Sequence, residues 1–218
     1  MKYKAVIFDM DGLLIDNYQA WRECSSRVFL NHGIALTDEE DSRLHGRSLA
    51  ENMIWLKTTY DLKASLEELS KEYLEASSSI YPELSRLMPG ADDLIKSLHA
   101  QGQKKAIASG SSLERIQKIV DRFKWRAYFD ELVSTDQVNF VGKPDPAIYH
   151  YTAKVLSLAP DECVVLEDSL NGVKAAKSAG MTCVAVPGAQ WNSTDFSVAD
   201  VVVNSLEDKS LLEFIGVF

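Results

Sequence analysis

The chain is poor in cysteine, which narrows the classes of protein it can belong to. Its 218 residues include three cysteines, Cys24, Cys163 and Cys183. This is an odd number, without the close spacing typical of metal-binding or paired cysteines. Cys163 and Cys183 lie in apolar, strand-like runs. We therefore expect buried, reduced thiols rather than disulfides or metal ligands.

Positive charge and long hydrophobic runs are also scarce. The 23 basic and 32 acidic side chains give a net charge of −9, which argues against a general surface for nucleic acid or anionic membranes. No apolar stretch approaches membrane-spanning length, and the first residues lead into a strand without a signal-peptide pattern. We expect a cytoplasmic, monomeric enzyme that binds neither nucleic acid nor membrane.

Helical and strand-like patterns alternate from Pro89-Gly90 onward. This alternation predicts right-handed crossovers and an α/β fold with a parallel sheet covered on both faces. The apolar run Ala5–Phe8 is too short to be independent, so it is expected to join this sheet. The expected helices are 91–100, 146–157 and 169–179, and the expected strands are 105–108, 132–133, 163–166, 183–186 and 201–203.

Residues 17 to about 80 have a different character, with helical spacing and no convincing strand. Three capping-box patterns, Thr37–Glu40, Ser48–Glu51 and Ser65–Glu68, mark helix starts. Apolar stripes follow at helical spacing: Trp21, Cys24, Val28 and Phe29; Leu49, Met53, Leu56 and Tyr60; Leu66, Leu69, Tyr73 and Ile80. We expect a helical cap over residues 16–81, inserted into a core of residues 1–15 and 82–218.

Two carboxylates stand directly behind the first expected strand. Asp9 and Asp11 follow the run Ala5–Phe8, and open α/β sheets bind ligands just beyond the carboxyl ends of their strands. Two acids at such a place repel each other unless a cation or a proton joins them. The alternative interpretation is an acidic turn that caps the next helix.

Three further polar clusters follow expected strands. Ser109-Gly110-Ser111 could bind an anion or merely cap a helix. Lys143 lies in the rigid turn GKPDP, although it could be a solvated loop residue, and Glu167-Asp168 could also be a helix cap. Taken together, the clusters concentrate acids that a hard cation such as Mg²⁺ would neutralise beside an anionic substrate.

The order of four motifs, DMDG, SGS, GKPDP and LEDS, resembles the haloacid dehalogenase superfamily. The helical insert between the first and second motifs is similar to the subgroup of β-phosphoglucomutase-like enzymes and sugar-phosphate phosphatases. The phrases FDMDGLLID and NGVKAAKSAGM add to this resemblance. It implies a Rossmann-like parallel sheet core with an inserted α-helical cap.

The resemblance also implies catalytic roles at the first and last motifs. Asp9 would be the nucleophile that forms an aspartyl phosphate, and Asp11 the general acid and then the general base. Mg²⁺ would be bound by the Asp9 carboxylate, the Asp11 backbone carbonyl and Asp168. Glu167 would support these ligands through hydrogen bonds rather than bind the ion itself.

The remaining expected site residues would bind the substrate, a small phosphorylated metabolite. The resemblance implies that Ser109, the Gly110 amide and Lys143 hold the phosphoryl oxygens and neutralise charge at Asp9. In the cap, Arg47 could bind a distal polar group, or be a solvated residue at a helix start. Trp21 would stack on the apolar face of a sugar or base.

The cap sequence favours hydrolysis over phosphoryl transfer within a sugar. β-Phosphoglucomutases carry a histidine in the first cap helix where this chain has Trp21, and an arginine after Gly-x-Ser where this chain has Leu49. The expected activity is a Mg²⁺-dependent phosphatase of hexose or hexitol phosphates, such as 2-deoxyglucose 6-phosphate. The alternatives are a pseudouridine or nucleotide 5′-phosphatase, a phosphomutase, and an inactive phosphate-binding protein.

Overall fold

The computed structural model describes residues 2–44, 49–188 and 194–216. Its main feature is a six-stranded sheet with the strand order β5-β4-β1-β6-β7-β8, in which every neighbouring pair is parallel. The α/β fold with a Rossmann-like parallel sheet is therefore confirmed. The strands are β1 (Ala5–Phe8), β4 (Lys104–Ser109), β5 (Glu131–Ser134), β6 (Cys163–Glu167), β7 (Thr182–Ala185) and β8 (Val201–Val202).

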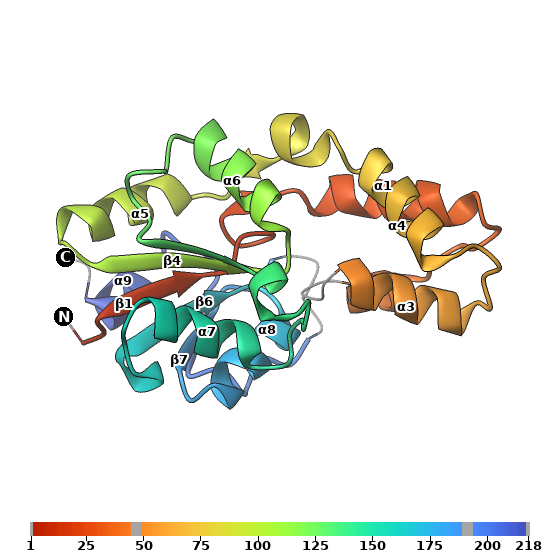
Figure 1. Ribbon diagram of the computed structural model, residues 1–218. Coiled ribbons are helices and arrows are strands. Elements are labelled where there is room, and N and C mark those ends of the chain that lie inside the picture. Colours follow the sequence, from red (N-terminus) through yellow and green to blue (C-terminus); the bar gives the residue numbers. More distant parts are fainter. Residues whose placement is uncertain (1, 45–48, 189–193, 217–218) are drawn as a thin grey trace.

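Helices cover both faces of this sheet, which explains why its central strands are apolar throughout (Figure 1). Val6 and Phe8 of β1 belong to the same buried cluster as residues of α5 (Ala91–Ala100), α6 (Leu113–Arg122) and α9 (Lys209–Ile215). Ala5 and Ile7 belong to the opposite cluster, with residues of α7 (Ala147–Val155) and α8 (Leu170–Ser178). Two short 3₁₀ turns, η2 (Thr135–Val138) and η3 (Pro160–Glu162), complete the connections.

Four helices form a second lobe beside the carboxyl end of β1 (Figure 1). They are α1 (Tyr18–Leu30), α2 (Asp38–Leu44), α3 (Leu49–Thr59) and α4 (Leu66–Ala76), and we call them the helical lobe. Both described capping boxes form, with Thr37 bonded to Glu40 and Ser65 to Glu68. The third one includes Ser48, which lies outside the described residues.

The apolar stripes of this lobe are mostly buried, as expected. Met53, Leu56, Leu69 and Tyr73 pack inside it. Leu66 does not, since it is 40% exposed as the first residue of α4. Among the described residues, no helix combines the length and apolarity needed to cross a bilayer. The three cysteines are free and buried.

Two short strands join the lobes, and the sequence pattern gives no sign of them. β2 (Ile15–Asp16) pairs in antiparallel fashion with β3 (Arg86–Leu87), so the two chain crossings lie side by side. A turn of π-helix, η1 (Ile80–Leu84), precedes β3. The division into a core of residues 1–15 and 82–218 and a cap of residues 16–81 stays a prediction.

Candidate active site

The strand order brings three of the predicted polar clusters together. β1 lies between β4 and β6, with Phe8 opposite Ile107 on one side and Leu166 on the other. Asp9 therefore follows β1 between Ser109, the last residue of β4, and Glu167, the last residue of β6. Residues far apart in the chain thus share the carboxyl edge of the sheet.

Lys143 lies between two buried carboxylates at this edge. Its Nζ is 2.5 Å from Oδ1 of Asp9, 2.5 Å from Oε1 of Glu167 and 3.1 Å from the carbonyl oxygen of Ala108. Lys143 is 1% exposed and Glu167 0%. Burial lowers the pKa of Lys143, but the two carboxylates outweigh burial and raise it well above its ordinary value. The ammonium therefore stays charged, and it favours the ionised form of Asp9.

Glu167 is held by four contacts in addition to its burial. Its Oε1 accepts hydrogen bonds from Lys143 and from the Tyr149 hydroxyl, and its Oε2 accepts from the amide and hydroxyl of Ser169. The backbone of Gly172 packs so closely that a Cβ there would lie 1.8 Å from Oε1. Because its oxygens already accept four hydrogen bonds, Glu167 is better suited to orienting Lys143 than to binding an ion.

Three carboxylates are close enough to share a cation. Oxygens of Asp9, Glu167 and Asp168 lie within 4.8 Å of one another. The close approach depends on Gly12, where φ is +89° and a Cβ would lie 2.2 Å from Oδ2 of Asp168. Because Glu167 already accepts four hydrogen bonds, Asp9 and Asp168 are better suited than Glu167 to bind a cation. An all-oxygen donor set of few carboxylates fits Mg²⁺, which keeps several water ligands.

The protonation of Asp9 gives a second reason for a cation. Burial raises the pKa of Asp9 to about 8, Lys143 opposes this rise, and the charges of Glu167 and Asp11 add to it. A carboxylate must be ionised to act as a nucleophile. A divalent ion beside Asp9 would favour the ionised form at neutral pH.

Asp11 is oriented by three donors. Its Oδ1 accepts from Asn17 at 2.5 Å, and its Oδ2 accepts from the hydroxyls of Ser111 at 2.8 Å and Ser109 at 3.3 Å. The Ser109 hydroxyl, predicted to bind phosphoryl oxygens, also accepts from the amide of Ser111. Ser111 was expected only as the last residue of the possible anion site Ser109-Gly110-Ser111, and Asn17, which directly follows the phrase FDMDGLLID, had no expected role.

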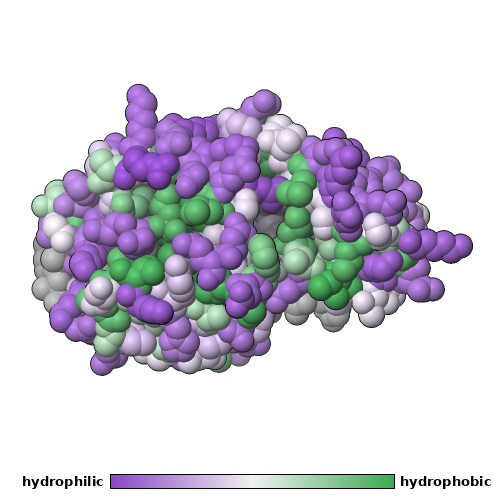
Figure 2. All heavy atoms as spheres, in the orientation of Figure 1, coloured by the Kyte–Doolittle hydropathy of each residue, from purple (hydrophilic) through white to green (hydrophobic). Residues whose placement is uncertain are grey.

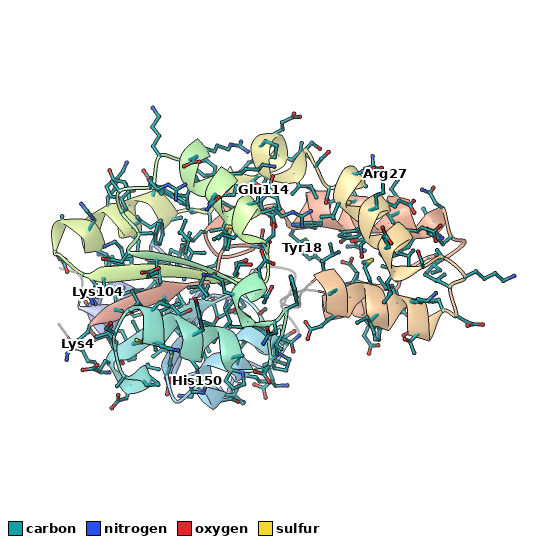
Figure 3. All side chains as sticks on the ribbon, in the orientation of Figure 1. Lys4, Tyr18, Arg27, Lys104, Glu114 and His150 are labelled. Carbon is teal, nitrogen blue, oxygen red and sulfur yellow. The ribbon has the colours of Figure 1, made fainter. Side chains whose placement is uncertain are left out.

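These groups line a cavity of about 360 Å³ between the two lobes. Figure 2 shows hydrophobic side chains of the helical lobe beside the hollow that separates the lobes, and Figure 3 places Tyr18 at this boundary. The cavity wall includes Gly110 and the half-buried Trp21. The Trp21 ring stacks on Tyr73 with centroids 5.6 Å apart. The predicted substrate contact Arg47 lies outside the described residues.

Comparisons with known proteins identify the family. A haloacid dehalogenase-like hydrolase family model matches residues 3–180. The phosphorylated carbohydrates phosphatase of Thermotoga maritima is 35% identical over 82% of this chain and 82% of its own. Hexitol phosphatase B of Escherichia coli is 31% identical over 97% and 96%. This chain belongs to the haloacid dehalogenase-like hydrolases and is an enzyme of that family.

A solved structure supports the same assignment. CbbY from Rhodobacter sphaeroides, in complex with xylulose-(1,5)bisphosphate, superposes with a TM-score of 0.82 at 27% identity, covering 94% of this chain and 95% of that one. The likeness spans both lobes, so the helical lobe is part of the shared architecture and not an addition peculiar to this chain.

Proposed function

We propose that the protein is a Mg²⁺-dependent phosphatase that hydrolyses small phosphomonoesters, with hexose or hexitol phosphates as its substrates. The observation that carries the proposal is the buried Asp9 carboxylate, which borders the cavity, pairs with Lys143 and lies within 4.8 Å of an Asp168 oxygen. The relatives named for carbohydrate and hexitol phosphates support the choice of substrate.

In the first step, Asp9 attacks phosphorus and the bond to the leaving alcohol breaks. Asp11 gives its proton to the departing oxygen, so the alcohol leaves neutral and an aspartyl phosphate remains on Asp9. Lys143, held by Glu167, compensates charge at Asp9. Mg²⁺ held by Asp9, Asp168 and the Asp11 carbonyl would neutralise charge on the phosphoryl oxygens.

In the second step, water attacks the phosphorus of the aspartyl phosphate. Asp11, now ionised, takes a proton from this water, and the bond between phosphorus and Asp9 breaks to release phosphate. The hydroxyl of Ser109 and the amide of Gly110 would bind phosphoryl oxygens during both steps. Uncatalysed hydrolysis of phosphate monoesters is among the slowest reactions known, so this positioning of charge supplies much of the rate.

The cavity suits a leaving group of modest size. Its volume of about 360 Å³ is at the lower end of the range for small-molecule sites, about 300–1,000 Å³. Trp21 lines the cavity, and an aromatic ring can contact the C–H face of a sugar. We propose this role for Trp21, with Arg47 as a contact to a distal hydroxyl.

A panel of phosphorylated metabolites tests the proposal directly. Phosphate release should be measured with Mg²⁺ on hexose phosphates, hexitol phosphates, pseudouridine 5′-phosphate and nucleoside monophosphates. We expect the highest kcat/KM on a hexose or hexitol phosphate. A preference for the nucleotides would reverse the substrate assignment, and conversion of a sugar phosphate to its isomer without phosphate release would show a mutase. If no phosphate were released from any substrate, p-nitrophenyl phosphate included, the protein would be an inactive phosphate-binding protein and not a phosphatase.

A further inference from the structure

Tyr81 lies in the π-helical turn η1, on the second chain crossing between the lobes, and is 2% exposed. Its carbonyl oxygen accepts a hydrogen bond from Arg122 of α6 at 2.8 Å. Its ring contacts Trp21 edge-on at 5.9 Å, and the Arg115 guanidinium lies 5.4 Å from its centroid. The backbone of Tyr81 is therefore fixed by α6, which packs on the sheet. Its ring is fixed by residues of both α1 and α6.

The Tyr81 hydroxyl is the outer end of a hydrogen-bond chain that ends on Asp11. It lies 2.5 Å from Oγ of Ser111, and that Oγ donates its single proton to Oδ2 of Asp11 at 2.8 Å. A hydroxyl has one proton to donate, so when Asp11 is ionised and accepts the Ser111 proton, Tyr81 is the donor to Ser111. Donors aligned in this way polarise one another and strengthen the bond to the final acceptor.

We propose that Tyr81 is a positioning residue that fixes the Asp11 carboxylate through Ser111 and ties its orientation to the crossing that carries the helical lobe. A shift of this crossing that separates Tyr81 from Ser111 removes the group that aligns the Ser111 hydroxyl toward Asp11. The proposal rests on the proposed function, since it concerns the residue that moves protons in both steps.

A second buried tyrosine, Tyr73, makes the same kind of hydroxyl–serine contact, but with Ser25 and not with the serine that is bonded to Asp11. The hydroxyl of Tyr73 lies 2.8 Å from Oγ of Ser25, and both residues belong to the helical lobe. Tyr73 is also buried and also contacts Trp21. Tyr73→Phe is therefore a matched control for the loss of a buried tyrosine hydroxyl bonded to a serine.

The kinetic test compares Tyr81→Phe, Ser111→Ala, the double variant and Tyr73→Phe. We expect Tyr81→Phe to lower kcat by about tenfold or more, a fraction of what general acid–base catalysis contributes, with little change in KM. In the Ser111→Ala background it should cause no further loss, because the chain is already broken. Ser111→Thr, which keeps the hydroxyl, should retain most of kcat, and Tyr73→Phe, which keeps the ring that stacks on Trp21, should lower kcat far less than Tyr81→Phe.

Unchanged kcat in Tyr81→Phe, or independent losses that multiply in the double variant, would overturn the proposal. Thermal unfolding of the same variants gives a readout that does not depend on turnover. The Tm losses of Tyr81→Phe and Ser111→Ala should be less than additive in the double variant, and additive losses would refute the chain itself. If wild-type protein hydrolysed no phosphomonoester, the proposed function would fail, and the Tm comparison would still decide whether Tyr81 and Ser111 are coupled.

Discussion

Replacing Lys143 with methionine is the most informative single perturbation of the site. The change keeps an unbranched side chain and removes an ammonium that lies 2.5 Å from both Asp9 and Glu167. Removal of one partner from a buried ion pair costs about 3–5 kcal/mol, because the remaining charge is left uncompensated. Since whole domains are stable by about 5–15 kcal/mol, the loss should be a large share of the free energy of unfolding.

The loss should also depend on pH, with a sign that the structure determines. Burial raises the pKa of Asp9 to about 8 in the folded protein. The ordinary value for an unfolded aspartate is near 4, so folded Asp9 keeps a proton between these values that the unfolded chain releases. Stability therefore falls as pH rises through this window. Lys143 opposes the shift, so Lys143→Met should lose more stability at high pH than at low pH.

Urea unfolding with a chelator present, at about pH 6 and about pH 9.5, on either side of the Asp9 pKa of about 8, measures both effects. The control is Lys177→Met. Lys177 pairs with Asp200 at 2.7 Å, and both side chains are about one-third exposed. Such an exposed pair is worth about 1 kcal/mol or less. The reasoning would be refuted if Lys143→Met cost no more than the control, or cost the same at both pH values.

Other perturbations should give equally distinct results. Asp9→Asn should abolish phosphate release while circular dichroism shows an intact fold, and Asp11→Asn should stop turnover or accumulate acid-stable phosphoenzyme; normal turnover by either would contradict the assigned roles. Chelation of divalent ions should silence the enzyme, and Ca²⁺ should restore it poorly because its looser coordination misplaces the phosphoryl group; full activity in chelator would argue against a metal. Gly172→Ala should lower the free energy of unfolding by about 1–3 kcal/mol, because its Cβ would meet the Glu167 carboxylate; an unchanged urea midpoint would contradict this packing.

Much of the sheet can be predicted from the sequence, because buried parallel strands have a strong local signal. β1 was predicted with both ends correct, since four apolar residues are bounded by Lys4 and Asp9. The helix α8 ends at Ser178, just before Gly180, whose φ of +78° is the left-handed conformation expected at a helix end.

The strands between the lobes have no such signal. β2 and β3 have two residues each, which is too short for any alternation to appear. Their pairing joins residues 15–16 to residues 86–87, which are far apart in the chain, so no local pattern indicates it. The same holds for Tyr81, whose hydroxyl partner Ser111 is 30 positions away.

At the site, the sequence predicts which residues gather but not how they bond. Lys143 and Glu167 were expected to act separately, one on phosphoryl oxygens and one near the cation, and the structure joins them in a buried pair. Tyr149 received no role, although it bonds Glu167 at 2.7 Å. The spacing of Tyr149 on α7 shows only that its side chain faces the core. The acceptor of its hydroxyl, Glu167, is the last residue of β6 and cannot be identified from that spacing.

The account depends most directly on covalent phosphorylation of one buried carboxylate. Enzyme quenched during turnover of a sugar phosphate can be reduced with borohydride, which converts an acyl phosphate of aspartate to homoserine, and the modified peptide can be located by mass spectrometry. We predict homoserine in place of Asp9, only when substrate and Mg²⁺ are both present. Continued turnover with no modification at Asp9, or with modification of another residue, would contradict the mechanism.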